Sequence, residues 1–310
     1  MKKWIQKILA GVLIAVQLGS LVVPFPSFAA EDTSSTSSET TSQNSVTSLK
    51  YVALGDSITA GDNTYVNMVG NYLKNRNGSC TVYNLGVGGL RSGDLLDAMT
   101  NSSHPAYQYV RTTIKGADVI TLDIGSNDIF VTAYEVFAKC FGCETDQLGA
   151  VYESWCARLQ SSNWFVRFVA YMQLLPIAQS IHEELYNGET MKAALEDFKS
   201  NYNAILQEID KLAPNAKVYI GNLYNPYNGA PAVYLGSYEV VNLQTFTEKY
   251  FCAMNKHIAN NSSGKKVVDL YSIFKDDTYL EADYATYNYD PHPNQAGQKE
   301  IANKFIAAMQ

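Results

Sequence analysis

The sequence predicts an α/β fold, a three-layer α/β/α sandwich with a doubly wound parallel sheet. Short apolar runs that are typical of buried strands recur along the chain, at 49–54, 80–85, 117–124, 217–221 and 266–270. Segments with the apolar spacing of helices lie between or after them, at 65–75, 93–99, 107–115 and 294–309. Because strands that alternate with helices form parallel sheets covered on both faces, the sandwich is the expected arrangement.

Each element has a local reason to form. The runs 49–54 and 80–85 end at glycines, which favour a turn after a strand. The run 117–124 is a strong strand candidate. The closing helix has Asn294 as its expected N-terminal cap. In such folds ligands bind beyond the carboxyl ends of the strands, so residues that directly follow a strand are candidates for function.

Composition and charge restrict the class of protein. The chain has 310 residues, of which 46% are hydrophobic and 17% charged, and this balance is typical of a globular protein with a substantial core. The formal net charge is −7. No basic footprint for nucleic acid is present, so we expect no nucleic-acid partner.

The N-terminus predicts export. Three lysines occur within the first seven residues, an apolar run covers 8–23, and Ser27 and Ala29 fit a small-x-small cleavage pattern. These features indicate a signal peptide, 1–29. An uncleaved membrane anchor is the alternative, but the apolar run is short for a span and interrupted. We therefore expect a secreted protein with no stable membrane anchor.

Two further segments are assigned by composition. Residues 30–48 are almost all polar and rich in serine and threonine, which predicts a disordered spacer before a folded domain at 49–310. The stretch 130–190 has no clear strand and predicts a helical insertion. Its apolar part, 165–181, is interpreted either as additional core or as a cap over the substrate site.

Five cysteines occur, an odd number, so at least one thiol is free or pairs between chains. Cys140 and Cys143 have CxxC spacing, but no second pair or histidine set completes a zinc site. We expect a structural disulfide among Cys140, Cys143 and Cys156, whose pairing the sequence leaves open.

Four short segments carry the candidate chemistry. Ser57 follows the first strand, a glycine-rich loop with Gly89 follows the second, and Asn127 follows the third. Asp290 and His292 precede the last helix. Hydrolysis by a serine needs a base for its proton, donors for the oxyanion and a carboxylate that orients the base. The four segments together supply all of these groups.

These segments, GDSIT, NLGVGG, GSND and DPHPN, resemble the four blocks of the SGNH hydrolases, also called GDSL esterases and lipases. The resemblance covers 49–310 and implies a flavodoxin-like sandwich. It implies that Ser57 is the nucleophile and His292 the base. It further implies that the N–H groups of Ser57 and Gly89 and the amide of Asn127 form the oxyanion hole, with no metal or other cofactor.

The last block departs from the family pattern. The family places an aspartate three residues before the histidine, where this chain has Tyr289, and Asp290 stands only two before. Either Asp290 orients His292 as the triad acid, or a backbone carbonyl does so and leaves a Ser–His dyad. In the second block Gly86 and Gly88 compete with Gly89, which the spacing from Asn84 favours.

The expected function is hydrolysis of carboxylic esters by a secreted esterase or lipase. The substrate is either a lipid, which the apolar 165–181 segment favours, or an O-acetylated polysaccharide, which tyrosines such as Tyr284, Tyr287 and Tyr289 favour. The alternative is a secreted, non-catalytic module on the same fold that binds carbohydrate or lipid. An α/β-hydrolase is disfavoured because the chain has no Gly-x-Ser-x-Gly elbow. The oligomeric state is left open.

Overall fold

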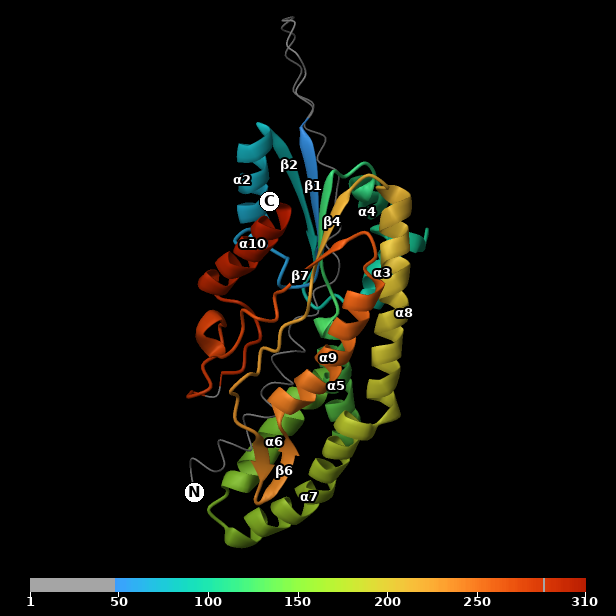
Figure 1. Ribbon diagram of the computed structural model, residues 1–310. Coiled ribbons are helices and arrows are strands. Elements are labelled where there is room, and N and C mark those ends of the chain that lie inside the picture. The colour runs from blue at the N-terminus through green and yellow to red at the C-terminus, as the bar shows by residue number, and fades with distance from the viewer. Residues whose placement is uncertain (1–47, 287) are drawn as a thin grey trace, which may run out of the picture.

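The computed structural model describes residues 48–286 and 288–310, so the predicted signal peptide and almost all of the spacer lie outside the described residues. A five-stranded parallel sheet forms the centre of the described chain (Figure 1). Its order in space is β2-β1-β3-β4-β7. The strands are β1 (Leu49–Gly55), β2 (Cys80–Gly86), β3 (Val119–Asp123), β4 (Lys217–Gly221) and β7 (Lys266–Val268). The predicted strands are all confirmed.

The order of the strands determines where a ligand can bind. The chain forms β1, adds β2 beside it at one edge of the sheet, and then crosses to place β3 on the other side of β1. This is the flavodoxin-like order, in which the direction of winding reverses between the first and third strands. A crevice opens at this reversal beyond the carboxyl ends of the strands. Ser57 and Asn127 follow the two strands that border it.

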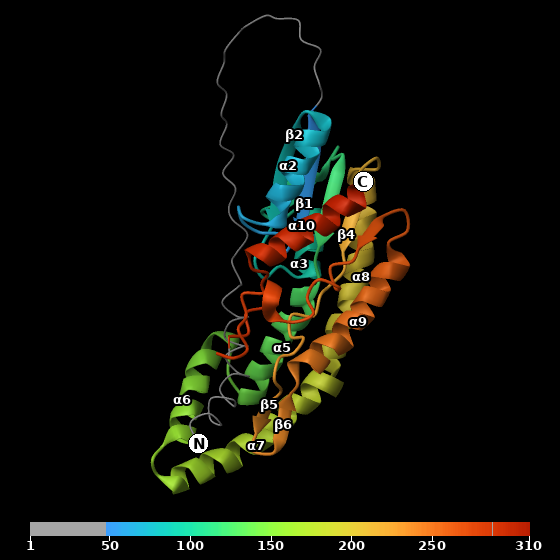
Figure 2. The same cartoon turned by 60° about the vertical axis from the view of Figure 1, so that its left-hand side comes forward.

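Helices cover both faces of the sheet, so the predicted three-layer sandwich is confirmed (Figures 1 and 2). On one face lie α2 (Tyr65–Asn77) and α10 (Gln295–Met309), where the rings of Tyr65 and Phe305 stack. The other layer consists of α3 (Ser92–Thr100), α4 (Tyr107–Ile114), α5 (Ser126–Phe141), α8 (Glu189–Leu212) and α9 (Leu243–Asn261). As predicted, Asn294 caps α10, with its side-chain oxygen 3.0 Å from the N–H of Gly297.

The stretch 130–190 is helical, as the sequence predicts. After α5 come a short turn of 3₁₀ helix (Thr145–Gln147), α6 (Leu148–Gln160) and α7 (Trp164–Asn187). The α6 and α7 helices form the end of the molecule remote from α2 in both views (Figures 1 and 2). No helix of the described residues is long and apolar enough to cross a membrane. A small antiparallel hairpin that the sequence analysis missed, β5 (Val233–Leu235) and β6 (Tyr238–Val241), packs against α7.

The predicted disulfide is wrong in this structure, because all five cysteines are free thiols. Cys140 lies near the end of α5 and its sulfur contacts the hydroxyl of Ser180 at 3.5 Å. The sulfur of Cys143 instead points to the carbonyl oxygen of Ala138 on its own helix end, 3.7 Å away. The two side chains of the CxxC pair therefore have different partners, and Cys156 lies on the separate helix α6.

Candidate active site

Ser57 is presented by a tight turn directly after β1. The strand ends at Gly55, where a Cβ atom would lie 2.2 Å from the hydroxyl of Thr59 and 2.5 Å from the carbonyl oxygen of Asp123, so only glycine fits. The carboxylate of Asp56 accepts the N–H of Ile58 at 3.0 Å and closes the turn. Ser57 is thereby held at the mouth of the crevice between β1 and β3.

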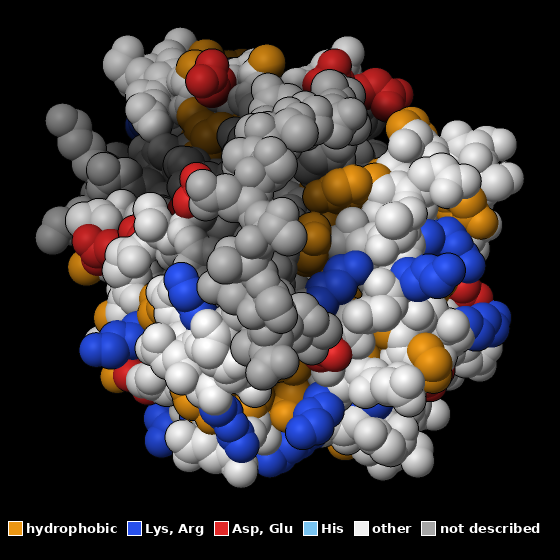
Figure 3. Space-filling model, turned by 90° about the horizontal axis from the view of Figure 1, so that it is seen from above, with side chains coloured by type: hydrophobic (Ala, Val, Ile, Leu, Met, Phe, Trp, Pro, Cys, Tyr) orange, Lys and Arg blue, Asp and Glu red, His pale blue; other side chains and the backbone are white. Residues whose placement is uncertain are grey.

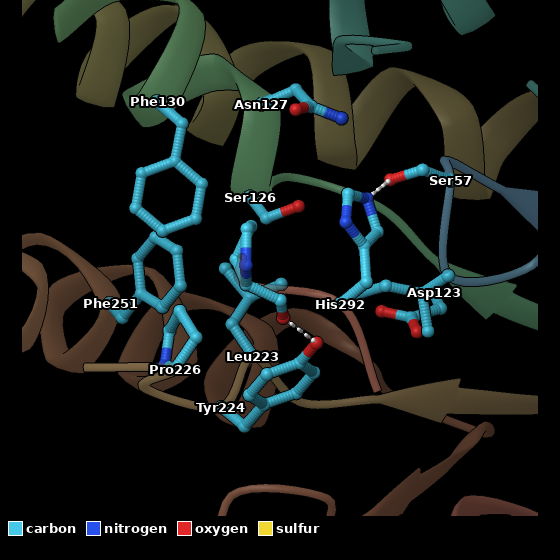
Figure 4. Close-up of a pocket in the computed structure, with 12 residues that line it drawn as sticks. Ser57, Asp123, Ser126, Asn127, Phe130, Leu223, Tyr224, Pro226, Phe251 and His292 are labelled. Atoms are coloured by element: carbon cyan, nitrogen blue, oxygen red, sulfur yellow. Dashed lines mark hydrogen bonds between the residues drawn. The ribbon is translucent and has the colours of Figure 1, made fainter. Parts of the chain in front are cut away.

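His292 reaches Ser57 from the opposite end of the chain. Its Nε2 lies 2.9 Å from the Ser57 hydroxyl oxygen (Figure 4). The segment that carries it is fixed on both sides, by the cap at Asn294 and by the hydroxyl of Tyr224, which donates to the carbonyl oxygen of Pro291 at 2.8 Å. The structure thus brings together the predicted nucleophile and base, 235 positions apart in the sequence.

Asp290 lies against the other ring nitrogen of His292. One carboxylate oxygen, Oδ1, is 2.5 Å from Nδ1 and also accepts the backbone N–H of His292 at 3.0 Å. An aspartate two residues before the histidine can therefore reach the ring by folding into a turn that its own side chain closes. Of the two alternatives left open by the sequence, the structure shows the carboxylate, not a backbone carbonyl, at this nitrogen.

Tyr289, at the position of the family aspartate, has a different environment. It is 2% exposed, and its ring packs on that of Tyr284. Neither tyrosine lines the pocket, so the suggestion that this group forms a carbohydrate cleft gains no support from the two. The third, Tyr287, lies outside the described residues.

Electrostatics couple Asp290 and His292. Burial on its own raises the pKa of Asp290, but hydrogen bonds from the ring and backbone of His292, together with the charge of the ring, outweigh it and the pKa is lowered. Burial likewise lowers the pKa of His292, but the hydrogen bond and charge of Asp290, and then the charge of Asp56, outweigh it and the pKa is raised. The imidazole is therefore a stronger base than an isolated histidine at the same depth.

Asn127 lies in the first turn of α5, directly after the loop that follows β3. Its amide nitrogen donates to the carbonyl oxygen of Leu90 at 3.2 Å and to the carboxylate of Asp56 at 3.3 Å. The same carboxylate oxygen accepts the hydroxyl of Ser126 at 2.6 Å. Asp56 therefore links the β1 and β3 loops. Both hydrogen bonds from the Asn127 amide lie at the long end of the N–H···O range. An anionic oxygen in the pocket can therefore compete for one of the two amide protons.

Among the predicted oxyanion-hole residues, Gly89 is the one that does not line the pocket. It is the third residue of a turn in which the N–H of Leu90 donates to the carbonyl oxygen of Val87 at 3.2 Å, and its φ of 74° is one that favours glycine. Gly89 precedes Leu90, whose carbonyl oxygen holds Asn127, so it lies next to the site without forming its wall.

The pocket combines the catalytic candidates with an apolar wall. Figure 4 shows Phe130, Phe251 and Leu223 on the side of His292 away from Ser57. The cavity volume is about 20 Å³, which is space for only a small group. Within the insertion only Phe130, from α5, lines the pocket, and α6 and α7 contribute no wall residue. The cap interpretation of the insertion therefore lacks support.

Asp123, the last residue of β3, is a pocket residue that sequence analysis missed. It is 2% exposed, and its Oδ2 has no hydrogen-bond partner. Burial, and then the charge of Asp56, raise its pKa well above the usual value. The only available signal was its position at a strand end before the GSND segment. In the described part of the chain no group of three or more metal-binding side chains is present.

The arrangement is that of a nucleophile with its base. A serine hydroxyl that donates to a histidine, whose far nitrogen donates to a carboxylate, can lose its proton as it attacks an electrophilic carbon. An asparagine amide lies nearby. These groups suit acyl transfer and need no metal.

Comparison with known protein families and structures assigns the chain to a family. Residues 53–300 match the model of the GDSL-like lipase/acylhydrolase family, which confirms the resemblance drawn from the four blocks. No curated protein sequence matches the chain. A structure similar to this one is the lipase Lip_vut3 from a goat rumen metagenome, with 22% identity, a TM-score of 0.54, and coverage of 84% of this chain and 97% of that one.

Two further solved structures resemble the chain more distantly. An extracellular lipase from Streptomyces rimosus has 15% identity and a TM-score of 0.47, over 84% of this chain and 98% of that one. A carbohydrate esterase of family 3 from Talaromyces cellulolyticus has 14% identity and a TM-score of 0.44, over 84% of this chain and 96% of that one.

Proposed function

Because the chain belongs to the GDSL-like lipase/acylhydrolase family, we propose that it is an exported serine hydrolase that cleaves carboxylic esters through an acyl-enzyme. The observation that carries the proposal is the continuous hydrogen-bonded series Ser57–His292–Asp290, with 2.9 Å and 2.5 Å between the bonded atoms. A binding module has no need of a base poised on a serine. Export is supported by the signal-like features of residues 1–29.

In the first half-reaction Ser57 Oγ attacks the ester carbonyl carbon while Nε2 of His292 takes the hydroxyl proton. The carbonyl π electrons move to oxygen and form a tetrahedral oxyanion. When the oxyanion collapses, the C–O bond to the alcohol breaks and His292 gives its proton to the departing oxygen. Asp290 stabilises the imidazolium that exists between the two transfers.

In the second half-reaction water replaces the alcohol. His292 takes a proton from water, whose oxygen attacks the acyl carbon, and then returns the proton to Ser57 Oγ as the acid leaves. The oxyanion of each half-reaction is stabilised by N–H donors. We propose the backbone N–H of Ser57 and the amide of Asn127 for this role, with the backbone N–H of Gly89 as the third donor.

The shape of the pocket favours a short acyl group. The wall of Phe130, Leu223 and Phe251 is apolar and the cavity volume is about 20 Å³. An acyl group of a few carbons can rest on this wall, whereas a long chain has to extend over the open side. The alcohol portion, whether of a lipid or of an acetylated sugar, then lies outside this cavity.

A series of p-nitrophenyl esters from acetate to palmitate tests the proposal, with the wild type compared with Ser57→Ala. We expect wild-type turnover that is highest for the short esters and loss of turnover in the variant. If a folded wild type cleaves none of the esters, or if the variant equals it, the alternative of a non-catalytic binding module replaces this proposal. A maximum at palmitate would contradict the short acyl group alone.

A further inference from the structure

Large hydrophobic side chains are exposed at the junction of α6 and α7, residues 155–172, which we call the α6–α7 tip. Trp164 is 69% exposed, Phe165 56%, Phe168 53% and Met172 51%. In the described residues, the other large hydrophobic side chains that count as exposed are Val82, Tyr109 and Tyr234, none above 40%. The apolar surface is thus concentrated in one place.

The four side chains form a single stripe on α7. Their spacing, one, three and four residues apart, keeps them on one side of a helix. The buried residues of the same helix, Ala170, Leu174, Ala178, Ile181 and Leu185, follow a second stripe on a different side. The helix therefore already has a face packed in the core, and the exposed stripe is additional to it. Contiguous exposed apolar surface of this kind marks interaction sites.

Charge around the tip differs from that of the whole chain. Residues 154–182 contain Arg158 and Arg167 and no aspartate or glutamate, although the chain has 30 acidic residues and a net charge of −7. The guanidinium of Arg158 lies 4.4 Å from the ring centre of Trp155, and Arg167 donates to the carbonyl oxygens of Ser161 and Ser162. Arg158 therefore lies over a partly buried ring of the tip, and Arg167 is held at the start of α7.

The opposite end of the molecule looks different. Figure 3 views it from above, and there both basic and acidic side chains are visible, with hydrophobic side chains scattered among them over the visible face.

We propose that the α6–α7 tip is a docking surface for an anionic lipid bilayer. Indole and phenyl rings favour the zone between lipid headgroups and acyl chains, and nearby arginines are attracted to anionic headgroups. In both views the tip projects from the end of the molecule that is remote from α2 and the main sheet. A flat surface can therefore reach it (Figures 1 and 2). A second copy of the chain is a poorer occupant, because a two-fold contact would bring the arginines of both copies together.

The test uses the protein without residues 1–29, so that the apolar N-terminal run cannot itself bind lipid. Residues 48–310 contain all five strands of the main sheet, both helix layers and both cores, so this form keeps the fold. It also removes Trp4, which leaves Trp155 and Trp164 as the two tryptophans, both on the tip. The Ser57→Ala background prevents hydrolysis of the vesicles.

Binding is measured by co-flotation with vesicles of phosphatidylcholine, with and without phosphatidylglycerol. We expect binding to the anionic vesicles with a blue shift of tryptophan emission, and binding at least tenfold weaker to neutral vesicles. The variant Trp164→Gln, Phe168→Gln, Met172→Gln should weaken binding by tenfold or more. The matched control Val82→Thr, Tyr109→Gln changes exposed apolar residues elsewhere and should bind unchanged.

Equal binding of the tip variant and the parent would overturn the proposal, as would a concentration-dependent dimer in sedimentation that only the tip variant lacks. Failure of the esterase proposal remains distinguishable. The tip variant with Ser57 restored is expected to cleave soluble p-nitrophenyl esters like the wild type, because none of the substituted residues lines the pocket.

Discussion

The carboxyl edge of the sheet and the α6–α7 tip both expose unusual side chains, but they do so by opposite means. At the sheet edge each functional group is held by a specific bond, such as the 2.5 Å contact between Asp290 and His292. At the tip, the exposed aromatic side chains Trp164, Phe165 and Phe168 lie on helix α7, and more than half of each side chain is open to solvent. The first region depends on fixed geometry, whereas the second depends on area and charge.

The difference predicts how each region responds to substitution. Loss of one side chain from the hydrogen-bonded series Ser57–His292–Asp290 prevents a proton transfer. Single substitutions at the sheet edge should therefore have large effects on turnover. Changes at the tip should be gradual and roughly additive in binding, with no effect on soluble substrates.

The largest effect is expected for His292→Ala. Without the base, Ser57 keeps its proton, and kcat should fall by about 10⁵-fold or more while KM changes little. The control is His182→Gln on α7, whose ring contacts the carbonyl oxygen of Val240 at 3.2 Å and does not line the pocket. Steady-state kinetics on a short p-nitrophenyl ester measure both, and equal loss in the control would disprove a specific role.

Asp290→Asn should lower kcat/KM by about 10³-fold, since the ring loses its orienting carboxylate. It should also move the acid limb of the pH profile. His292 works only when neutral, and Asp290 raises its pKa, so activity is lost as pH falls through that raised value. In the variant burial dominates and lowers the pKa, so the limb should shift to lower pH. A limb that stays in place would show that Asp290 does not control His292.

Asn127→Ala should lower kcat by about 10²- to 10³-fold with little change in KM, because an oxyanion donor acts in the transition state. Asn303→Ala on the exposed side of α10 is the matched control. A loss expressed mainly in KM would point to substrate binding instead of stabilisation of the oxyanion.

The adjacent residue should behave differently. Asp128 does not line the pocket, and its carboxylate accepts the N–H of Ser92 at 2.9 Å and the hydroxyl of Ser92 at 2.5 Å. Burial raises its pKa to about 6 despite these bonds. The folded protein therefore holds a proton that the unfolded chain has lost, and stability should fall as pH rises from about 4 to about 6.

Asp128→Asn removes this titration. Two pKa units correspond to about 2–3 kcal/mol, so the variant should lose roughly that much of the pH dependence of its unfolding free energy. Urea denaturation at pH 4.5 and 7 measures it. Turnover should stay within about twofold of the wild type, and a large loss of kcat would place Asp128 in the catalytic machinery.

Much of the fold and site was predictable because it depends on local pattern. Buried parallel strands appear as continuous Val- and Ile-rich runs, and the residues after them mark the crevice. The reach of Asp290 was not predictable, because it depends on a side-chain turn within three residues. Asp123 was missed because a carboxyl at a strand end shows its burial only when the neighbouring strands are in place.

The α6–α7 tip shows the other limit of sequence analysis. Tryptophan and phenylalanine are residue types that usually pack in a core, so the sequence does not distinguish Trp164, Phe165 and Phe168 from core residues. Only their exposure in the folded chain does so. The expected disulfide failed for a similar reason, since CxxC spacing does not fix where the sulfurs of Cys140 and Cys143 point.

The most direct test of the central claim is covalent trapping of the nucleophile. The wild type is treated with an alkyl fluorophosphonate, digested and analysed by mass spectrometry, beside His292→Ala and Ser126→Ala. We predict one adduct, on Ser57, that forms at least 10³-fold more slowly in His292→Ala and persists in Ser126→Ala. An adduct on Ser126, or no adduct on a folded protein that cleaves esters, would contradict the assignment of Ser57 as nucleophile.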